Sequence, residues 1–587
     1  MKAPYRPSLL LILLLTLFGC ERSDTPGTTA DKESSPLPEA DTILLNGHIY
    51  TLEGVHPWAE AVAIREGKYS YVGSNQGAQA YRGDQTDVID LQGKMAMPGI
   101  NDAHSHPWQG GMKRLYECTF AFSATPQQVN ERVAECVKNN PEQTWIQGGQ
   151  WTSDFFNNYR LESPKGWLDR VSGDKAVVLE DDAGHNLWVN SKALELAGIT
   201  ADTADPEGGV FVRDAAGEPN GLVLEAAKHL ITSHIPDWSH EQYMAALAEA
   251  VAEANRFGLT GISEARTPAA ASKAYQQLDR EGRLSAYAIT FLQTQRGQRE
   301  TPLAIEPLTE AAEQYRSDHV YTQFVKIFLD GVPTASRSAS MLHPYLVNEE
   351  FPESTTGMLL IKPEVLQQDL QALDRAGLTV KIHTAGDGAV RTALDAIATV
   401  RAVNGDSGLR FQLAHAGYID PTDLPRFAEL NVTADLSPYI WFPSPIIDSI
   451  INAVGERAKQ YWPVKDLLFS GADLLAGSDW PSAVDDMNPW PAIEALVTRR
   501  DPITNGDEPL WGEQAISLEQ ALWIFTMGGA RAYRLEHLTG SVAVDKSADL
   551  IVLNQNLFEV SIERVSETQV EQTFFEGQLV YSRDAGK

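Results

Sequence analysis

Two histidines one residue apart, His104 and His106, stand at the end of the short apolar run "MPGINDAH" and just beyond it. In a β-strand, residues i and i+2 point to the same face, so both imidazoles can hold one ion from one side. Further candidate ligands lie in or at the end of later apolar runs: Lys326, His383, His415 and Asp479. A lone histidine at a strand end is more often an ordinary core residue. Imidazoles and a carboxylate that recur in this way suit Zn²⁺ and similar ions, so the pattern predicts a metal centre.

Eight short apolar runs alternate with helical stretches, which is the signature of a (β/α)₈ TIM-type barrel of the α/β class. The runs are "MPGINDAH", "LTGISEA", "AYAITFL", "FVKIFLDG", "LTVKIHTAGD", "LRFQLAHAG", "NVTADLSP" and "DLLAGSDWP". In such a barrel the reactive groups stand at the carboxyl ends of the strands. The six candidate ligands belong to the first, fourth, fifth, sixth and eighth runs, so we expect them to meet at one mouth of the barrel.

The segments on either side of the barrel have a different pattern. Residues 41–97 read as short alternating strands broken at glycines, and residues 541–587 repeat this pattern. We expect them to be two halves of one composite β-sandwich. This leaves residues 98–540 for the barrel, with residues 108–257 as an insertion after its first strand.

The start of the chain predicts export. A positively charged start and the apolar run "LLLILLLTLFG" are typical of a signal peptide over residues 1–19, and the run is too short to span a membrane. "LTLFGC" resembles a bacterial lipobox, in which Cys20 becomes the lipidated first residue, although a plain signal peptide with a chance cysteine stays open. Residues 20–40 predict a flexible tether. Glu21 favours an outer-membrane lipoprotein that faces the periplasm.

Composition narrows the range of partners. The formal net charge of −32 argues against nucleic acid or anionic lipid as a partner. We expect a small-molecule substrate and no membrane contact beyond the lipid anchor, and we leave a homodimer open.

Two cysteines remain beyond the predicted lipidation site, Cys118 and Cys136. In an exported protein, two cysteines separated by an apparent helix favour a disulfide over a metal pair. Such a bond requires the two Cα atoms to lie within about 7 Å.

The chain resembles the amidohydrolase superfamily from residue 41 to its end. The order HxH, Lys, His, His, Asp along a barrel carries this resemblance. The motifs "NDAHSHPW", "GHNLWVNSKAL", "VKIFLDG", "HTAGDGAV" and "AGSDWP" are similar to the amidohydrolase 3 group, which includes N-substituted formamide deformylase. Two departures concern the pocket. The segment 182–185 reads Asp-Ala-Gly-His where the group often has Asp-Gly-His, and Thr384-Ala385 stands where Ala followed by an aliphatic residue or Asn is commoner.

The resemblance implies a set of ligands for two divalent ions, which we expect to be zinc. It implies a first ion on His104, His106 and Asp479, a second on His383 and His415, and Lys326, carboxylated by CO₂, as the bridge. A protonated lysine cannot act as this bridge, because its ammonium has three hydrogen-bond donors and no acceptor. The alternative is that Lys326 forms an ion pair with Asp330 or another carboxylate.

The resemblance also implies a reaction, the hydrolysis of a non-peptide C–N (amide) bond through a metal-bound hydroxide. Asp479 would act as the general base and pass the proton to the leaving nitrogen. His185 would stabilise the oxyanion, or it is a structural histidine of its loop. Two alternatives stay open, namely a cyclic amide, carbamate or ester as the substrate and a non-catalytic binding or regulatory lipoprotein on the same scaffold.

The insertion is rich in aromatic residues that could cover the barrel mouth and accept an apolar acyl or amine group. They are Trp145, Trp151, Phe155, Phe156, Tyr159, Trp167 and Trp188. Most of them could equally form the core of the insertion, and Trp151 is the best candidate for lining the pocket. Arg337, after the fourth run, could bind a substrate carboxylate or make a structural contact.

Overall fold

The computed structural model describes residues 37–586 apart from a few short gaps. The gaps are residues 122, 153–154, 182–183, 185, 207, 296, 335, 349–350, 443–444, 483, 505 and 507. The predicted signal peptide, Cys20 and most of the predicted tether lie outside the described residues. All elements below belong to one unit, Glu39–Lys587. In the described part of the chain, no helix is long and apolar enough to cross a membrane.

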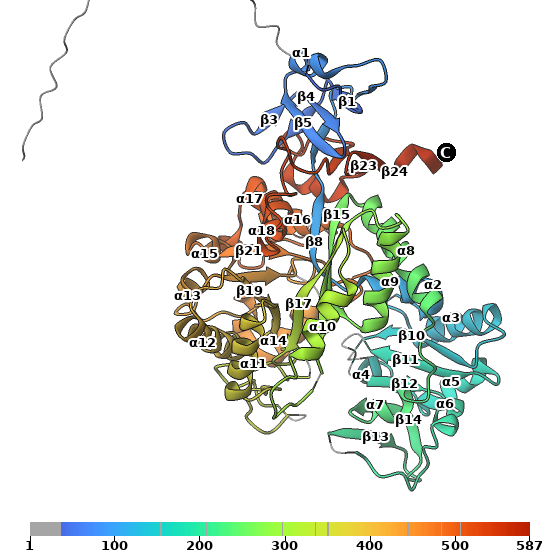
Figure 1. The fold of residues 1–587 in the computed structure, drawn as a ribbon. Coiled ribbons are helices and arrows are strands. Elements are labelled where there is room, and N and C mark those ends of the chain that lie inside the picture. The colour runs from blue at the N-terminus through green and yellow to red at the C-terminus, as the bar shows by residue number, and fades with distance from the viewer. Residues whose placement is uncertain are drawn as a thin grey trace, which may run out of the picture. The chain divides into compact units, whose positions relative to one another are not determined.

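Eight parallel strands form the barrel, and their order in the sheet follows their order in the chain (Figure 1). They are β8 (Ile100–Ser105), β15 (Leu259–Thr267), β16 (Tyr287–Gln293), β17 (Val320–Phe328), β18 (Thr379–Thr384), β19 (Phe411–His415), β20 (Val432–Leu436) and β21 (Asp473–Ala476). Each overlaps one of the eight apolar runs, so the predicted barrel is confirmed. At the carboxyl end, Asp479 N donates to His104 O at 2.7 Å. His106 N donates to Trp480 O at the same distance, so hydrogen bonds join the segment that follows the last strand to the carboxyl end of the first.

Helices precede, connect and follow the barrel strands. Helix α8 (His240–Arg256) leads from the insertion into β15. The helices between later strands are α9 (Ala269–Arg280), α10 (Glu306–Tyr315), α11 (Pro363–Arg375), α12 (Asp387–Asn404), α13 (Leu424–Glu429), α14 (Pro445–Val454) and α15 (Val464–Phe469), and those after β21 are α16 (Pro489–Thr498), α17 (Leu518–Trp523) and α18 (Gly529–Ala532). Helix α11 illustrates why these segments form helices. Pro363 opens it, where no backbone N–H is needed, and Leu366, Leu370 and Leu373 recur at helical spacing and are buried in the main core.

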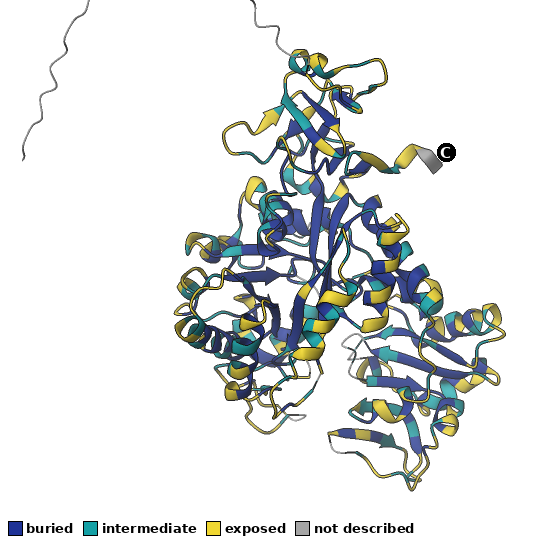
Figure 2. Cartoon of the chain, in the orientation of Figure 1, coloured by how far each residue is buried: buried dark blue, intermediate teal, exposed yellow. Residues whose placement is uncertain are grey.

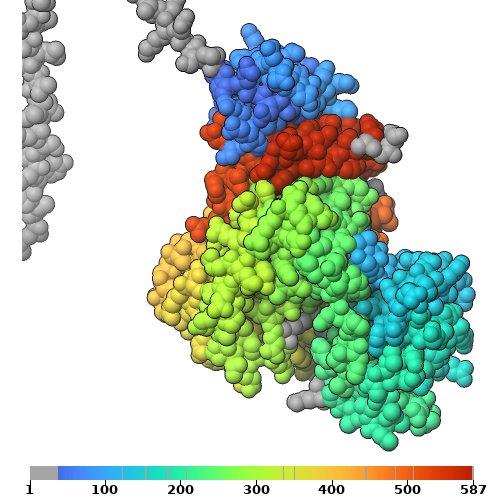
Figure 3. Space-filling view, turned by 45° about the vertical axis from the view of Figure 1, so that its right-hand side comes forward, coloured from blue at the N-terminus to red at the C-terminus, as the bar shows by residue number. Residues whose placement is uncertain are grey.

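Both ends of the described chain contribute to two packed sheets outside the barrel, ordered β5-β4-β1-β6 and β24-β23-β22-β7-β2-β3. The elements are β1 (Thr42–Leu45), β2 (His48–Tyr50), β3 (Trp58–Ala59), β4 (Ala61–Arg65), β5 (Lys68–Gly73), α1 (Asn75–Ala78), β6 (Asp87–Asp90), β7 (Met95–Pro98), β22 (Leu550–Leu553), β23 (Val570–Phe575) and β24 (Gln578–Ser582). Met97 pairs with Ile551 in an antiparallel ladder, so the blue and red segments that lie side by side in Figure 3 share one sheet. Val62 of one sheet and Phe574 of the other lie in a common apolar cluster, which confirms the composite sandwich.

The insertion between β8 and β15 contains a six-stranded sheet of its own, ordered β13-β14-β12-β11-β10-β9. Its elements are α2 (Pro107–Tyr116), β9 (Cys118–Thr119), α3 (Pro126–Asn139), β10 (Trp145–Trp151), α4 (Phe155–Asn158), α5 (Pro164–Ser172), β11 (Ala176–Asp181), β12 (Asn186–Val189), α6 (Ser191–Leu196), β13 (Gly209–Arg213), β14 (Pro219–Glu225) and α7 (Lys228–Thr232). Along β11, Val177 and Leu179 enter one apolar cluster, whereas Ala176 and Val178 enter another. This alternation buries both faces of the sheet, as the dark strands in Figure 2 show.

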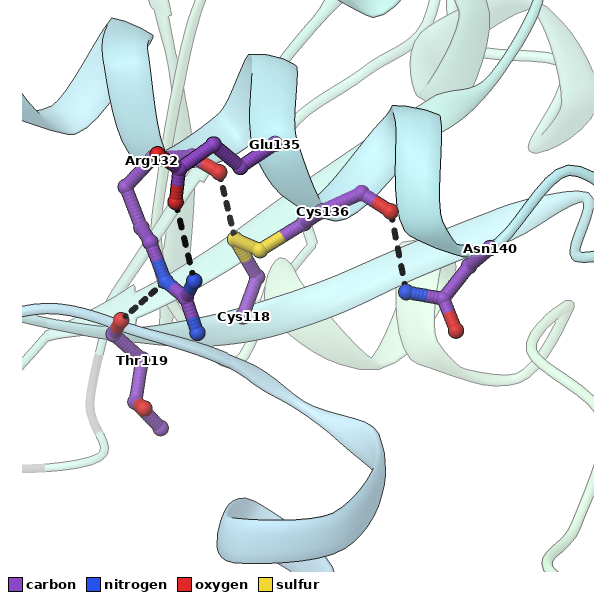
Figure 4. Close-up of a disulfide and its surroundings, with 6 residues drawn as sticks. All are labelled: Cys118, Thr119, Arg132, Glu135, Cys136 and Asn140. Atoms are coloured by element: carbon purple, nitrogen blue, oxygen red, sulfur yellow. Dashed lines mark hydrogen bonds and ion pairs between the residues drawn. A yellow bond between two sulfur atoms is a disulfide. The ribbon is translucent and has the colours of Figure 1, made fainter.

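A disulfide joins β9 to α3 within the insertion (Figure 4). The Cα atoms of Cys118 and Cys136 lie 5.8 Å apart. Arg132 adds a second link, because its Nε donates to Thr119 O at 2.9 Å. Strand β9 is at the edge of its sheet, so these two links hold the edge strand against the helix.

Candidate active site and metal centre

Four imidazoles meet at the carboxyl end of the barrel. The ring centroid of His104 lies 5.8 Å from that of His106 and 4.8 Å from that of His415. The centroids of His415 and His383 are 4.7 Å apart. The barrel thus gathers into one continuous group histidines that are up to 311 residues apart in the sequence.

Asp479 and Lys326 complete the cluster. Asp479 Oδ1 lies 3.3 Å from His106 Nε2 and 3.6 Å from His104 Nε2. The ligand atoms of these three residues all lie within 4.8 Å of one another, which is a suitable spacing for one ion. Lys326 Nζ lies 3.4 Å from His104 Nε2. The structure therefore brings all six predicted ligands together.

The backbone around the cluster has features that few residues tolerate. His415 (φ 68°) and Asp479 (φ 59°) both lie in the left-handed region, which is uncommon outside glycine and clusters at functional sites. A Cβ at Gly477 would lie 2.2 Å from the backbone nitrogen of His104. Only glycine permits this close approach, which brings Asp479 beside the first histidine pair.

A buried carboxylate supports His104 from behind. His104 Nδ1 lies 2.8 Å from Oδ2 of Asp435 in β20. The same oxygen accepts a hydrogen bond of 2.5 Å from Lys381 Nζ, which also donates to Ala103 O at 2.8 Å. The contact on Nδ1 leaves Nε2 as the ring atom of His104 that faces the cluster.

His383 has a similar support. Its Nδ1 lies 3.0 Å from Oδ1 of Asp330, and Asp330 also accepts three hydrogen bonds from backbone N–H groups. Within the described residues no ion pair links Asp330 to Lys326, so the alternative reading of Lys326 as the partner of Asp330 is not observed.

The other two histidines have longer outer contacts. His106 Nδ1 lies 3.6 Å from Glu264 Oε1, and among the described residues both atoms are buried without a hydrogen-bond partner. His415 Nδ1 lies 3.4 Å from Ser437 Oγ. Each imidazole of the cluster therefore has a different neighbour behind it.

Burial shapes the protonation of the cluster. Burial lowers the pKa of His104 and His415 well below the usual value, so both rings are neutral and offer a lone pair. Burial acts to raise the pKa of Asp479, but the hydrogen bond from His106 and the nearby Lys326 lower it overall. Burial and the nearby Lys381 lower the pKa of Lys326 to about 7. Neutral imidazoles and an ionised carboxylate are the forms that bind divalent metals, so this donor set fits zinc.

Comparison with known sequences agrees with this site. The model of the amidohydrolase family matches residues 87–581. The chain belongs to the amidohydrolase family. Protein LONG AFTER FAR-RED 3 of Arabidopsis thaliana is 31% identical to it, with 92% of each chain covered. The N-substituted formamide deformylase of Arthrobacter pascens is 26% identical, with 92% of this chain and 98% of the relative covered.

Solved structures share the fold of this amidohydrolase. An uncharacterized metal-dependent hydrolase from Pyrococcus horikoshii OT3 matches with a TM-score of 0.70 at 23% identity, and the match covers 89% of this chain and 99% of the other. Membership of the amidohydrolase family makes the protein a hydrolase of the class that acts on carbon–nitrogen bonds.

The structure gives Trp151 of this amidohydrolase a packing role, and its predicted place in the substrate pocket stays a prediction. Its side chain is buried in the core of the insertion, its Nε1 donates to Leu179 O at 2.9 Å, and its ring meets that of Phe156 edge-on. Phe155 and Trp188 lie in the same cluster. Most of the aromatic residues of the insertion belong to its core, as in the alternative interpretation, because the separate sheet of the insertion needs a core of its own, whereas Tyr159 is exposed.

Arg337 is likewise engaged in a structural contact. It is buried, its Nη1 donates to Leu346 O, and its guanidinium carbon lies 4.1 Å from the ring centroid of Phe351. The structural alternative is thus the one observed, because these contacts tie the loop after β17 to itself. His185, the candidate oxyanion partner, lies outside the described residues.

Three residues behind the ligands of this amidohydrolase are not singled out by the sequence: Asp435, Lys381 and Glu264. A signal for them exists. Lys381 stands two residues before His383 and therefore points to the same face of β18. Asp435 and Glu264 are carboxylates inside the seventh and second apolar runs, where a charged residue needs a partner.

Proposed function

We propose that this amidohydrolase uses two divalent ions, which we expect to be zinc, to hydrolyse a non-peptide amide bond. In this proposal Asp479 is the general base. The observation that carries the proposal is the convergence of six ligand-type side chains at the carboxyl end of the barrel. On this proposal, His104, His106 and Asp479 hold the first ion and His383 and His415 hold the second. Bound there, the ions would polarise the substrate carbonyl and lower the pKa of the attacking water.

Lys326 is the proposed bridge, in its carboxylated form. The amine nitrogen would attack the carbon of CO₂, form an N–C bond and lose a proton to solvent, which leaves an anionic carbamate. Lys326 suits this role because it is buried and, among the described residues, has no carboxylate partner. The neighbouring Lys381 does not suit it, because Asp435 and Ala103 O already hold its ammonium.

Asp479 is the proposed carrier of the proton. In its ionised form it accepts a proton as the water oxygen adds to the amide carbon, and it delivers that proton to the nitrogen as the C–N bond breaks. Its contact with His106 directs the carboxylate toward the cluster. His185 is retained as the proposed partner of the developing oxyanion on the strength of its motif "GHNLWVN" alone.

The substrate class can be tested directly with the zinc-loaded enzyme. Because a related enzyme is an N-substituted formamide deformylase, N-formyl amines are the first substrates to test, followed by N-acyl amino acids and aryl amides. We expect one of these amides to be hydrolysed, with activity lost on chelation and restored by zinc. Faster turnover of cyclic amides, carbamates or esters would instead identify one of these classes as the substrate. A zinc-loaded enzyme that cleaves no amide contradicts the proposal.

We also propose that the mature protein is exported and anchored in the outer membrane through an acylated Cys20. This proposal is supported by the lipobox-like "LTLFGC" and the polar segment that follows it.

A further inference from the structure

Behind the ligand His104 the barrel contains a chain of buried polar groups from three strands. His104 at the end of β8 contacts Asp435 in β20, and Asp435 accepts a hydrogen bond from Lys381 in β18. Lys381 is fixed further by Ala103 O, which also accepts from Tyr533 OH at 2.8 Å. The side chains of His104, Asp435 and Lys381 have no exposed surface.

Stability alone does not account for this pair of charges. Removing a lysine and an aspartate from water costs free energy that their attraction only partly returns, and apolar side chains of similar volume often serve a core equally well. In addition, Asp435 Oδ1 is buried without a hydrogen-bond partner among the described residues. A carboxylate with one unused oxygen is poorly arranged for packing, whereas its other oxygen is well placed for His104.

We propose that Asp435 and Lys381 are positioning residues that hold His104 in the tautomer required for metal binding, an inference that rests on the proposed function. A carboxylate oxygen can only accept, so the ring proton of His104 lies on Nδ1 and the lone pair of Nε2 faces the cluster. Lys381 can only donate. Its hydrogen bond to the same Oδ2 fixes that oxygen as an acceptor at the place where His104 meets it.

The other ligands do not share this arrangement. Asp330, behind His383, is held by backbone N–H groups, and the contacts behind His106 and His415 are 3.6 and 3.4 Å long. Loss of the Lys381–Asp435 pair should therefore weaken the ion bound by His104 more than the ion bound by His383.

The test measures zinc affinity in metal-free protein, by competition with a chromophoric chelator. Asp435→Asn should weaken binding of one ion about 10- to 100-fold, and Lys381→Met should weaken it in the same direction. The double variant should lose less than the sum of the two losses, because the residues act as one unit. Asp369→Asn is the matched control, since it disrupts the buried Arg299–Asp369 pair and contacts no ligand. It should leave zinc affinity unchanged.

The proposal is overturned if folded Asp435→Asn and Lys381→Met bind both zinc ions within twofold of the wild type. Should the variants not fold, ¹⁵N-histidine NMR of the metal-free wild type decides, with His104→Ala used to assign the signal. His104 protonated on Nδ1 supports the proposal, and His104 protonated on Nε2 overturns it. Neither readout uses catalysis. A protein that shows the expected affinities but cleaves no amide would lose the proposed function and retain the positioning pair.

Discussion

Lys326 and Lys381 lie opposite each other on neighbouring barrel strands, but within the described residues only Lys381 donates to a carboxylate. The two buried lysines therefore have different surroundings. Lys381 is held as an ammonium behind His104, whereas Lys326 faces the imidazole cluster. This difference explains why we assign the bridging role to Lys326.

Asp479→Asn should keep the fold and much of the metal but lower turnover by about a hundredfold or more, because the amide cannot accept the proton. Turnover and metal content measured on the same preparation check this. Asp473→Asn is a matched control, since Asp473 begins β21, the strand that leads to Asp479, and pairs with Arg410 and Arg531. Its turnover should stay near that of the wild type. Near-normal turnover in Asp479→Asn would rule out its role as the base.

Replacement of Cys118 and Cys136 by serine should destabilise the insertion by about 3 kcal/mol, because the bond closes a loop with a sequence separation of 18 residues. The free energy of unfolding in denaturant, measured for the double variant and the wild type, tests this. Zinc content should not change, since the disulfide lies within the insertion. Equal stability of the two proteins would show that the disulfide is dispensable.

His319 should make stability depend on pH. Its hydrogen bonds with Asp279 and Glu576 raise its pKa to about 10. A pKa raised in the folded state stabilises the protein fully below the unfolded value of about 6.5, and this contribution is lost as the pH rises through about 10. His319→Gln should therefore cost most stability at pH 6 and almost none above pH 10. Melting curves at pH 6, 8 and 10, with the exposed His56→Gln as control, test this, and a constant difference between wild type and variant contradicts it.

Cys20→Ser should release a processed soluble protein or leave an unprocessed precursor, because the acyl chains supply the proposed anchor. Fractionation of cells into membrane and soluble parts measures the outcome. Ser23→Ala, three residues further on, should remain in the membrane fraction. Equal membrane association of Cys20→Ser and the wild type would disprove lipidation as the anchor.

The barrel and its ligands could be predicted from the sequence because their signals are local. A parallel strand buried on both faces reads as a continuous apolar run, and each of the eight runs marks a strand. His104 and His106 are visible as a pair two residues apart. His383 and His415 lie toward the ends of their own runs, so their meeting follows once a barrel is assumed.

The remaining features depend on contacts between distant segments. Asp435 meets His104 across 331 positions of sequence, and no local pattern reveals that contact. The six-stranded sheet of the insertion combines strands of different lengths and directions. Trp151 is therefore part of the core of this sheet, although its motif alone had predicted a place at the pocket.

Metal content of zinc-loaded wild type and Lys326→Ala, measured per chain by mass spectrometry, tests the two-ion site most directly. The exposed Lys362→Ala serves as control. We predict two ions in the wild type and the control, and one ion with little turnover in Lys326→Ala, because no anion then lies between the two sites. Short carboxylic acids in the buffer should partly restore both. Two ions and near-normal turnover in Lys326→Ala would contradict the bridging role and the two-ion account built on it.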